Sequence, residues 1–488
     1  MAEAWMKYLK TDDRERKEQT HMMNKGEKYE IEITDLGNNG EGIGRIDGMA
    51  VFVPGALPGD RIMAEITETK KSFAKGKLTE ILSQSSFRVE PSCIYADRCG
   101  GCGLQGMTYE GQLTLKKKWV IDRLARIGGV EDPKVLDVIG MEEPWRYRNK
   151  VRYTVSRISG PEKKLRGCNL GFSRKMSHEI IDCESCMLQT EVADRIAQAV
   201  REYVKATKIP IYDEKTGTGV LRHVVVKTAF GTGEVMVILV ATERRIPAVE
   251  LLIDGIEDAL EGLDFYLESL ILNVNKQRKG PEMGKDSITL AGKPTIMDRL
   301  MDMDFEISPL SFYQVNPIQT EKLYKKVSEY AALSGTETVL DLYCGVGTIG
   351  LTLADKAKRV IGIESVKSAI IDANRNATIN GIVNAEYIHG KAEEELPKLL
   401  GQGVQADVVI LDPPRAGCDP ALLGAVAAAG PSRIVYVSCD PATLARDIKI
   451  LTQQGYRFVE AQPVDMFPHT GHVETVVMMC ASSEAGRC

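Results

Sequence analysis

The C-terminal part of the sequence, from about Phe305 onward, alternates short apolar segments with segments of helical spacing. The apolar segments are residues 339–341, 360–364, 407–412, 434–438 and a late one at 473–479. Apolar strands separated by helices predict a doubly wound, mainly parallel sheet. Ligands of such sheets bind at the carboxyl ends of the strands. Four polar or reactive residues end or directly follow these strands, and we expect them to share one edge: Tyr343, Glu364, Asp412 and Cys439.

A chain of 488 residues exceeds one ordinary hydrophobic core, so we expect several domains. Residues 1–24 are polar and lack the apolar run of a signal peptide, which predicts a loose tail. Residues 25–84 alternate with period two between Gly- and Pro-rich turns, as in a small β-barrel. No apolar run reaches the roughly 20 residues of a membrane span. We therefore expect a cytoplasmic protein without membrane contact, acting as a monomer.

The central residues, 85–300, have a mixed pattern. Residues 112–127 have helical spacing, and a helical part near 108–142 is expected to pack on the C-terminal domain described above. Residues 219–226 and 234–240 are two apolar runs that predict paired strands. The expected architecture is a multidomain α/β protein with an N-terminal β-barrel, a mixed α+β central domain and a C-terminal, Rossmann-like doubly wound domain at 301–488.

Positive charge is concentrated within an acidic chain. The formal net charge is -6, yet the segment from Pro144 to His178 holds ten Lys or Arg and one acid, Glu162. Smaller basic groups stand at 70–77 and 116–118. One lysine cluster alone is usually a solvated face. Several such groups in an acidic protein favour a footprint for nucleic-acid phosphates.

A glycine-rich turn, Gly345-Val-Gly347, follows the first strand of the doubly wound domain. Glycines there let the backbone approach a ligand closely, and Glu364 at the end of the next strand is placed to accept hydrogen bonds from ribose. Gly345, Gly347 and Gly350 have the Gly-x-Gly-x-x-Gly spacing of dinucleotide sites, so the turn alone fits either cofactor. We expect S-adenosylmethionine rather than a nicotinamide cofactor at this turn.

The third strand ends in Asp412-Pro-Pro-Arg415, in which two prolines make a stiff lip. Methyltransferases that act on amino groups often carry an aromatic residue where Arg415 stands, so this motif argues against an exocyclic amine as the acceptor. An arginine suits a phosphate or a carboxylate instead.

Cys439 follows the fourth strand and is expected to be exposed by a turn. An isolated cysteine is usually a buried hydrophobe, but this one shares its sheet edge with the cofactor turn. Uracil C5 is a poor nucleophile until a thiolate adds to C6. The site should therefore stabilise the Cys439 thiolate, and a base must then remove the C5 proton. Glu474 is the best base in the sequence, and the target base must leave its stack to be reached.

A compact cysteine group, Cys93-x5-Cys99-Gly-Gly-Cys102, lies in the central region, with Cys183 and Cys186 further on. Cysteines in a cytoplasmic chain are more often ligands than disulfides. Cys93, Cys99, Cys102 and a later cysteine could hold a [4Fe-4S] cluster. Alternatively, two Cys-x-x-Cys pairs give a zinc-like pattern: Cys99, Cys102, Cys183 and Cys186.

Together these motifs resemble the RNA m5U methyltransferase family, specifically its 23S rRNA branch. The resemblance runs from about Gly26 to Met479 and rests on segments that occur in order: Ser311-Phe-Tyr-Gln-Val-Asn316, Asp341-Leu-Tyr-Cys-Gly345, Asp412-Pro-Pro-Arg415, Ser438-Cys-Asp-Pro-Ala-Thr-Leu-Ala-Arg-Asp447, Asp465-Met-Phe-Pro468 and His472-Val-Glu474. The barrel resembles a TRAM domain, which binds RNA. Lys391 and Asp440 depart from the usual pattern without touching the reaction type.

The resemblance implies roles for single residues. Gln314, Tyr343, Glu364 and Asp412 would bind S-adenosylmethionine, Cys439 would be the nucleophile and Glu474 the base. The resemblance also places the fourth ligand of the cluster at Cys186, giving Cys93, Cys99, Cys102 and Cys186. Because the family's tRNA branch lacks the barrel and the cysteine group, the partner implied is 23S rRNA.

Three other functions stay open at this point. The same chemistry on a tRNA uridine is the first, and an inert iron–sulfur protein that only binds RNA is the second. The second would be expected to lack Cys439 or Glu474, and both are present. A small-molecule methyltransferase, the third, leaves the barrel and the basic segment unexplained.

Overall fold

The computed structural model describes residues 23–37, 40–158 and 167–482, and this part of the chain forms two compact units. The barrel unit comprises Met1–Ser92 and Gly103–Gln112, and the catalytic unit comprises Cys93–Cys102 and Leu113–Cys488. Part of the basic segment, residues 159–166, lies outside the described residues, as does most of the predicted tail. No helix in the described ranges is long and apolar enough to cross a membrane.

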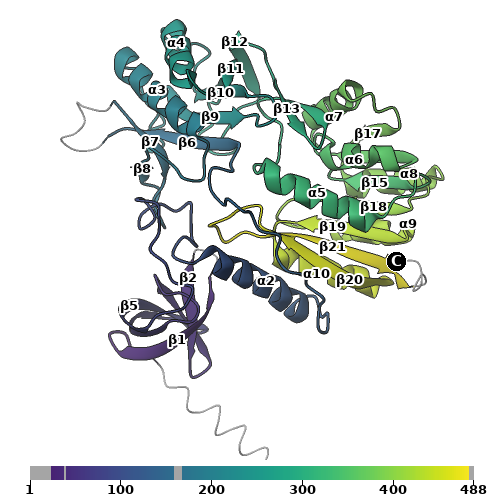
Figure 1. Cartoon of the computed structure of the whole chain (residues 1–488), viewed down its shortest axis with the longest axis horizontal. Coiled ribbons are helices and arrows are strands. Elements are labelled where there is room, and N and C mark those ends of the chain that lie inside the picture. Colours follow the sequence, from purple (N-terminus) through teal and green to yellow (C-terminus); the bar gives the residue numbers. More distant parts are fainter. Residues whose placement is uncertain (1–22, 38–39, 159–166, 483–488) are drawn as a thin grey trace, which may run out of the picture. The chain divides into compact units, whose positions relative to one another are not determined.

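The barrel unit contains a closed five-stranded barrel, as the alternating pattern predicts (Figure 1). Its strands follow the order β1-β2-β3-β5-β4: β1 (Lys28–Leu36), β2 (Glu41–Ile46), β3 (Met49–Pro54), β5 (Phe73–Ser83) and β4 (Arg61–Thr69). Side chains of period two, including Ile31, Ile33 and Ile62, fill the interior. Closure leaves no free sheet edge among these strands.

The catalytic unit contains two seven-stranded sheets. The central sheet has the order β12-β11-β10-β9-β6-β7-β8. Its strands are β6 (Lys150–Ser156), β7 (Asn169–Ser173), β8 (Ile180–Asp182), β9 (Leu221–Thr228), β10 (Glu234–Ala241), β11 (Tyr266–Val274) and β12 (Asp286–Gly292). The strands β9 and β10 pair in antiparallel fashion and confirm that prediction, whereas β10 and β11 are parallel.

Two amphipathic helices, α3 (Glu191–Thr207) and α4 (Val249–Leu260), cover one face of the central sheet (Figure 1). The opposite face contributes Val225, Met236 and Ile238 to a second core. That core also includes residues of the other seven-stranded sheet, here called the catalytic sheet. A two-stranded hairpin, β13 (Ile296–Leu300) and β14 (Met303–Ile307), leads from one sheet to the other along the chain. The central sheet is therefore packed on both faces.

The catalytic sheet has the order β17-β16-β15-β18-β19-β21-β20. Its strands are β15 (Thr338–Leu342), β16 (Arg359–Glu364), β17 (Ala385–His389), β18 (Val408–Leu411), β19 (Arg433–Ser438), β20 (Tyr456–Val464) and β21 (Glu474–Ala481). The first five in the sheet order are parallel, and β21 is antiparallel to both β19 and β20. The doubly wound, mainly parallel sheet is thus confirmed. The sequence pattern missed β17 and β20, whose residues are mixed with polar side chains and less buried.

Helices cover both faces of this sheet. One core brings α5 (Pro317–Ala331), α6 (Thr348–Leu353) and α7 (Lys367–Ile379) against Val339, Val360 and Val435, with the short η2 (Ala354–Lys356) after α6. The other brings α8 (Ala392–Gly401), α9 (Pro420–Ala429) and α10 (Pro441–Gln453) against Leu340 and Ile434. The predicted helix at 112–127 is α2 (Tyr109–Arg126), and its residues Val120 and Leu124 join this second core.

Candidate active site

The nucleophile and base predicted from the sequence stand side by side at one edge of the catalytic sheet. Cys439 directly follows β19, and Glu474 is the first residue of β21. The two strands are antiparallel, and Ser438 pairs with Thr475, so the end of one strand meets the start of the other. The ladder register therefore fixes the position of the thiol relative to the carboxyl group.

The environment of Cys439 disfavours the thiolate. The thiol is only partly exposed, and its burial, together with the negative charge of Glu474, raises the pKa of Cys439 to about 11. The positive charge of Arg415 acts in the opposite direction but is smaller. The protein alone therefore does not supply the thiolate stabilisation expected from the sequence, because burial of the thiol and the charge of Glu474 outweigh the charge of Arg415.

The two carboxyl groups whose charges act on Cys439 have raised pKa values themselves. Burial raises the pKa of Glu474 to about 8, with the charge of Asp412 adding to the effect and that of Arg415 opposing it. Burial likewise raises the pKa of Asp412 to about 7. A carboxylic acid with a pKa near neutrality is a better proton acceptor than an ordinary one, and it suits a general base.

A buried network holds the lip that carries Asp412 and Arg415. The carboxylate of Asp447, in α10, accepts hydrogen bonds from the Tyr436 hydroxyl at 2.6 Å and from the backbone N–H of Cys418 at 2.8 Å. Next to it, Arg446 donates to the carbonyl of Ala416 at 3.0 Å. Asp447 is fully buried, so these bonds are shielded from water. The lip is thereby fixed to the helix that starts beside Cys439.

The cofactor turn has the features of a close-approach loop. Tyr343, Gly345 and Gly347 have positive φ angles of 66°, 55° and 83°. A Cβ on Gly347 would lie 2.6 Å from the Tyr387 hydroxyl, whereas one on Gly345 would meet nothing within 4 Å. The turn thus has open space at one glycine and a tight contact at the other, which leaves room for a ligand at Gly345.

Two acids line this turn. The Glu364 carboxylate accepts hydrogen bonds from the backbone N–H groups of Gly345 at 3.3 Å and Val366 at 2.7 Å. One oxygen of Asp341 accepts from Gly350 N–H at 2.9 Å, while the other is buried without a partner in the described structure. Burial raises the pKa of Asp341 to about 7. An orphaned buried oxygen beside a glycine turn fits a site built for a polar ligand, and sequence reasoning did not single out this residue.

The segment carrying Gln314 is held by the central sheet. Asn149 is buried, donates from its side chain to the carbonyl of Gln314 at 2.9 Å, and donates from its backbone N–H to Val315 at 3.0 Å. Lys227, also buried, donates to the carbonyls of Ser308 at 2.7 Å and Ser311 at 3.2 Å. The Gln314 side chain itself remains partly exposed. Neither Asn149 nor Lys227 was expected from the sequence to act here, because their partners are backbone groups.

The segment before Glu474 is anchored by contacts from earlier parts of the chain. Lys116 and Asp465 form a fully buried ion pair with an Nζ–Oδ1 distance of 2.6 Å. Trp145 stacks on His469 with ring centroids 3.7 Å apart, and the Tyr147 hydroxyl donates to the carbonyl of Pro468 at 3.1 Å. The base therefore follows a segment whose course is fixed before β21 begins.

The cysteines of the central region lie on two loops that are bonded to each other. Residue Gly100 donates to the carbonyl of Ser173, and Lys175 donates through its backbone to Arg98 and through its side chain to Ala96. The hydroxyl of Tyr95 accepts from Glu184 N–H at 3.2 Å, one residue beyond Cys183. The bond between Tyr95 and Glu184 joins the loop of Cys93, Cys99 and Cys102 to that of Cys183 and Cys186, and the other bonds join the first loop to the turn after β7.

The cysteines of these loops shift one another's pKa values. Burial raises the pKa of Cys99, and the charges of Cys186 and Cys93 add to the effect. A hydrogen bond from the Cys183 thiol lowers the pKa of Cys186 to about 7. Within residues 23–37, 40–158 and 167–482, no group of three or more His, Cys, Asp or Glu side chains is arranged to hold a metal ion. In the part of the chain described, this holds for both predicted ligand sets, that of the [4Fe-4S] cluster and the zinc-like one.

Comparison with known proteins identifies relatives of this chain. The chain is 51% identical over 454 residues to an uncharacterized RNA methyltransferase of Caldanaerobacter subterraneus. The alignment covers 93% of this chain and 98% of that relative. A similar protein of Clostridium tetani, also an uncharacterized RNA methyltransferase, is 47% identical over 455 residues, covering 93% and 96%. Among solved structures, the chain resembles the tRNA (uracil-54, C5)-methyltransferase of Pyrococcus abyssi in complex with S-adenosyl-L-homocysteine. The TM-score is 0.73 at 32% identity, over 92% of this chain and all of that one.

The doubly wound sheet, its carboxyl-edge site and these likenesses define an S-adenosylmethionine-dependent RNA methyltransferase. Residues 267–482 match the tRNA (uracil-5-)-methyltransferase family, and residues 23–79 match the TRAM domain. The chain belongs to the tRNA (uracil-5-)-methyltransferase family and carries an N-terminal TRAM domain.

Proposed function

We propose that this protein methylates C5 of a uridine in 23S rRNA, with Cys439 as the nucleophile and Glu474 as the general base. The observation that carries the proposal is the register of β19 and β21, which sets a thiol and a carboxyl group of raised pKa beside each other at the cofactor edge. Gln314, Tyr343, Glu364 and Asp412 are the proposed residues that bind S-adenosylmethionine. When bound, that donor supplies an electrophilic methyl group on a cationic sulfonium.

The proposed reaction begins with the sulfur of Cys439. Its thiolate forms a bond to C6 of the uracil, and the electrons of the C5–C6 double bond move toward C5 and the C4 carbonyl. C5 then forms a bond to the methyl group as the sulfonium–carbon bond breaks. The Glu474 carboxylate takes the C5 proton, the C5–C6 double bond re-forms, and the thiolate leaves. Each covalent bond made to the protein is thus broken again, and the enzyme is regenerated when Glu474 releases its proton to solvent.

Arg415 is proposed to assist the first step. It is exposed at the lip, and its charge lowers the pKa of both Cys439 and Glu474. A guanidinium in this position favours both groups in the ionised forms that the reaction needs. Asp447 and Arg446 hold the backbone just beyond Arg415, so the chain that carries this side chain is ordered without the substrate.

The choice of 23S rRNA rests on the barrel and the cysteine loops, which the family resemblance associates with the rRNA branch. A tRNA uridine is the second candidate, since the match to the Pyrococcus abyssi tRNA enzyme covers 92% of this chain and therefore extends into the barrel. The expectation that tRNA enzymes of this family lack the barrel is thus wrong for that enzyme, and the barrel does not separate the two substrates. Release of tritium from C5-labelled uridine should be measured on 23S rRNA fragments and on tRNA transcripts. We expect release from the rRNA. Release from tRNA alone would replace the rRNA proposal while leaving the chemistry intact.

We also propose that the cysteine loops hold a [4Fe-4S] cluster through Cys93, Cys99, Cys102 and Cys186. Four thiols on loops that are bonded together match the donor set of such a cluster. Each iron of the cluster takes one thiolate, so the sulfur atoms stand farther apart than ligands around one ion. The cluster is proposed as a structural element, because methyl transfer needs no redox step.

The cluster is tested by its absorbance. Anaerobically purified protein should show a broad visible band together with bound iron and sulfide. Cys186→Ala should lose the band, whereas Cys183→Ala should keep it. Loss with Cys183→Ala and bound zinc in the native protein would favour the alternative ligand set.

A further inference from the structure

A loop of the central sheet carries positive charge that the proposed chemistry does not use. Residues 275–285, between β11 and β12, are here called the basic arm. Its exposed cations are Lys276, Arg278, Lys279 and Lys285. Its one acid, Glu282, pairs with Arg152 at 2.7 Å, and Asp286, which follows the arm, pairs with Arg244 at 3.0 Å. Within the described part of the chain, the three lysines of the arm have no ion-pair partner.

Three buried side chains hold the backbone of the basic arm: Asn275, Arg222 and Asn273. The Asn275 side chain donates to the carbonyls of Pro281 and Glu282, both at 2.9 Å, and accepts from Gln277 N–H at 3.0 Å. Arg222 donates to the carbonyl of Gln277 at 2.7 Å. Such bonds order an exposed loop that would otherwise be free to move.

Asn273 holds the far end of the arm. Its side chain accepts from Gly284 N–H at 2.7 Å and donates to the carbonyl of Gly284 at 2.9 Å. At Gly284 the arm passes so close to β11 that a Cβ would lie 1.8 Å from the Val274 carbonyl. The arm is therefore fixed at both ends and in its middle, while its lysine side chains remain in solvent.

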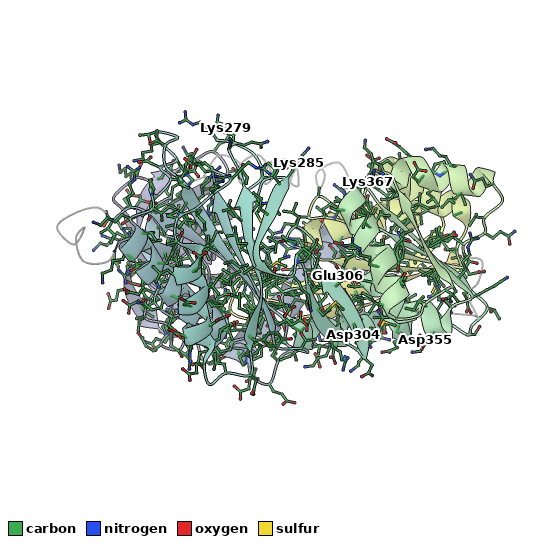
Figure 2. The ribbon with its side chains drawn as sticks, turned by 90° about the horizontal axis from the view of Figure 1, so that it is seen from above. Lys279, Lys285, Asp304, Glu306, Asp355 and Lys367 are labelled. Atoms are coloured by element: carbon green, nitrogen blue, oxygen red, sulfur yellow. The ribbon has the colours of Figure 1, made fainter. Side chains whose placement is uncertain are left out.

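Figure 2 shows Lys279 and Lys285 on the same side of the view as Lys367, with Asp304 and Asp355 on the opposite side and Glu306 near the middle. Lys367 begins α7 and comes three positions after Glu364, so it belongs to the carboxyl edge of the catalytic sheet. Asp355 precedes β16 and belongs to the other edge. In this view the labelled lysines of the arm are thus on the same side as Lys367 of the carboxyl edge.

We infer that the basic arm binds phosphates of the substrate RNA outside the target uridine. Preordered lysines without protein partners are suited to phosphates as point charges, and such contacts fix position without reading sequence. This inference rests on the proposed RNA methylation, which supplies the partner.

The test compares two double variants of equal charge change. Lys279→Gln/Lys285→Gln removes two cations of the arm, and Lys356→Gln/Lys358→Gln removes two exposed lysines beside Asp355. Kd for the RNA that the native protein methylates should be measured at several KCl concentrations, with S-adenosylhomocysteine binding by calorimetry as a folding check. We expect the arm variant to weaken RNA binding about tenfold and to reduce the salt slope by about 1 to 2. The second variant should change neither by much.

Two results would overturn the inference. An arm variant with native Kd and native salt slope would exclude phosphate contacts by these lysines. Equal weakening by both variants would show that only net charge matters. If the native protein methylates no uridine, the proposed function fails first, and the arm has no RNA partner to bind. Because native methylation is measured separately, failure of the arm and failure of the function are distinguished.

Discussion

The catalytic unit contains two sheets of seven strands that use polar residues in opposite ways. In the catalytic sheet, parallel strands bring Tyr343, Glu364, Asp412 and Cys439 to one edge, and the antiparallel β21 adds Glu474 to that edge. In the central sheet most neighbours are antiparallel, so strand ends alternate between edges. Strand direction therefore decides which sheet can gather reactive groups.

The central sheet uses its buried polar residues to hold backbone instead. Asn149 and Lys227 bind carbonyls of the segment that carries Gln314, and Asn275 binds carbonyls of the basic arm. None of these side chains reaches Cys439 in the contacts described. The comparison suggests a division in which one sheet supplies reacting groups and the other positions the segments that meet cofactor and RNA.

The largest expected effect is at the nucleophile. Cys439→Ala should lower turnover by about four orders of magnitude or more and abolish the covalent RNA adduct, because no other group can add to C6. The matched control is Cys168→Ala, which removes a buried thiol of the central sheet. That variant should keep the adduct on denaturing gels. Normal methylation by Cys439→Ala would contradict the proposed mechanism outright.

The next effect separates the two halves of the reaction. Glu474→Gln should lower turnover by about 10² to 10⁴-fold and let the methylated adduct accumulate, because the C5 proton is no longer removed. Labelled RNA that stays with the protein on denaturing gels would report this. Glu234→Gln, a buried acid of the central sheet that binds Met297 N–H, serves as the control. Absence of any adduct in Glu474→Gln would mean that the base acts before methyl transfer.

The pH dependence follows from the raised pKa values. Glu474, with a pKa of about 8, and Cys439, with a pKa of about 11, both react in deprotonated form. The ratio kcat/KM should thus rise by about tenfold or more per unit as pH increases toward about 8. A flat profile over this range would show that neither group limits the rate.

Stability should change with pH in the opposite direction. Glu474 is neutral in the folded protein at pH values where the unfolded chain has already ionised, so stability is lost as pH rises from about 4.5 to about 8. Glu474→Gln should show a smaller loss of Tm over the same range. Equal slopes for the two proteins would contradict the raised pKa.

The smallest expected effects test whether the central sheet positions the segments that meet the cofactor and the RNA. Asn149→Ala should weaken binding of S-adenosylhomocysteine about tenfold, because the segment of Gln314 loses a buried tether. Asn275→Ala, equally buried and equally bonded to backbone, should leave that binding unchanged and weaken RNA binding a few-fold. Calorimetry and RNA titration of both variants give the answer. If both variants affect both ligands alike, the asparagines act only through stability.

Much of this architecture could be predicted from local pattern. The barrel follows from period two between turns, and the catalytic edge follows from residues placed at strand ends. The strands β17 and β20 could not, because their residues are less uniformly apolar. The thiol pKa of Cys439 also escaped prediction, since it depends on Glu474, 35 residues later in the chain and adjacent only through the ladder. Asn149 and Lys227 escaped because a side chain that binds a distant carbonyl leaves no sequence motif.

The position of β21 has a consequence for how the protein is made. This strand follows every other strand of the catalytic sheet along the chain, yet it lies inside the sheet, between β19 and β20. During synthesis, Cys439 and the cofactor turn emerge first, and β21 emerges after all the other strands of the sheet. Glu474 comes with this last strand. A nascent or shortened chain thus holds a thiol without its base, so complete turnover requires completion of the sheet.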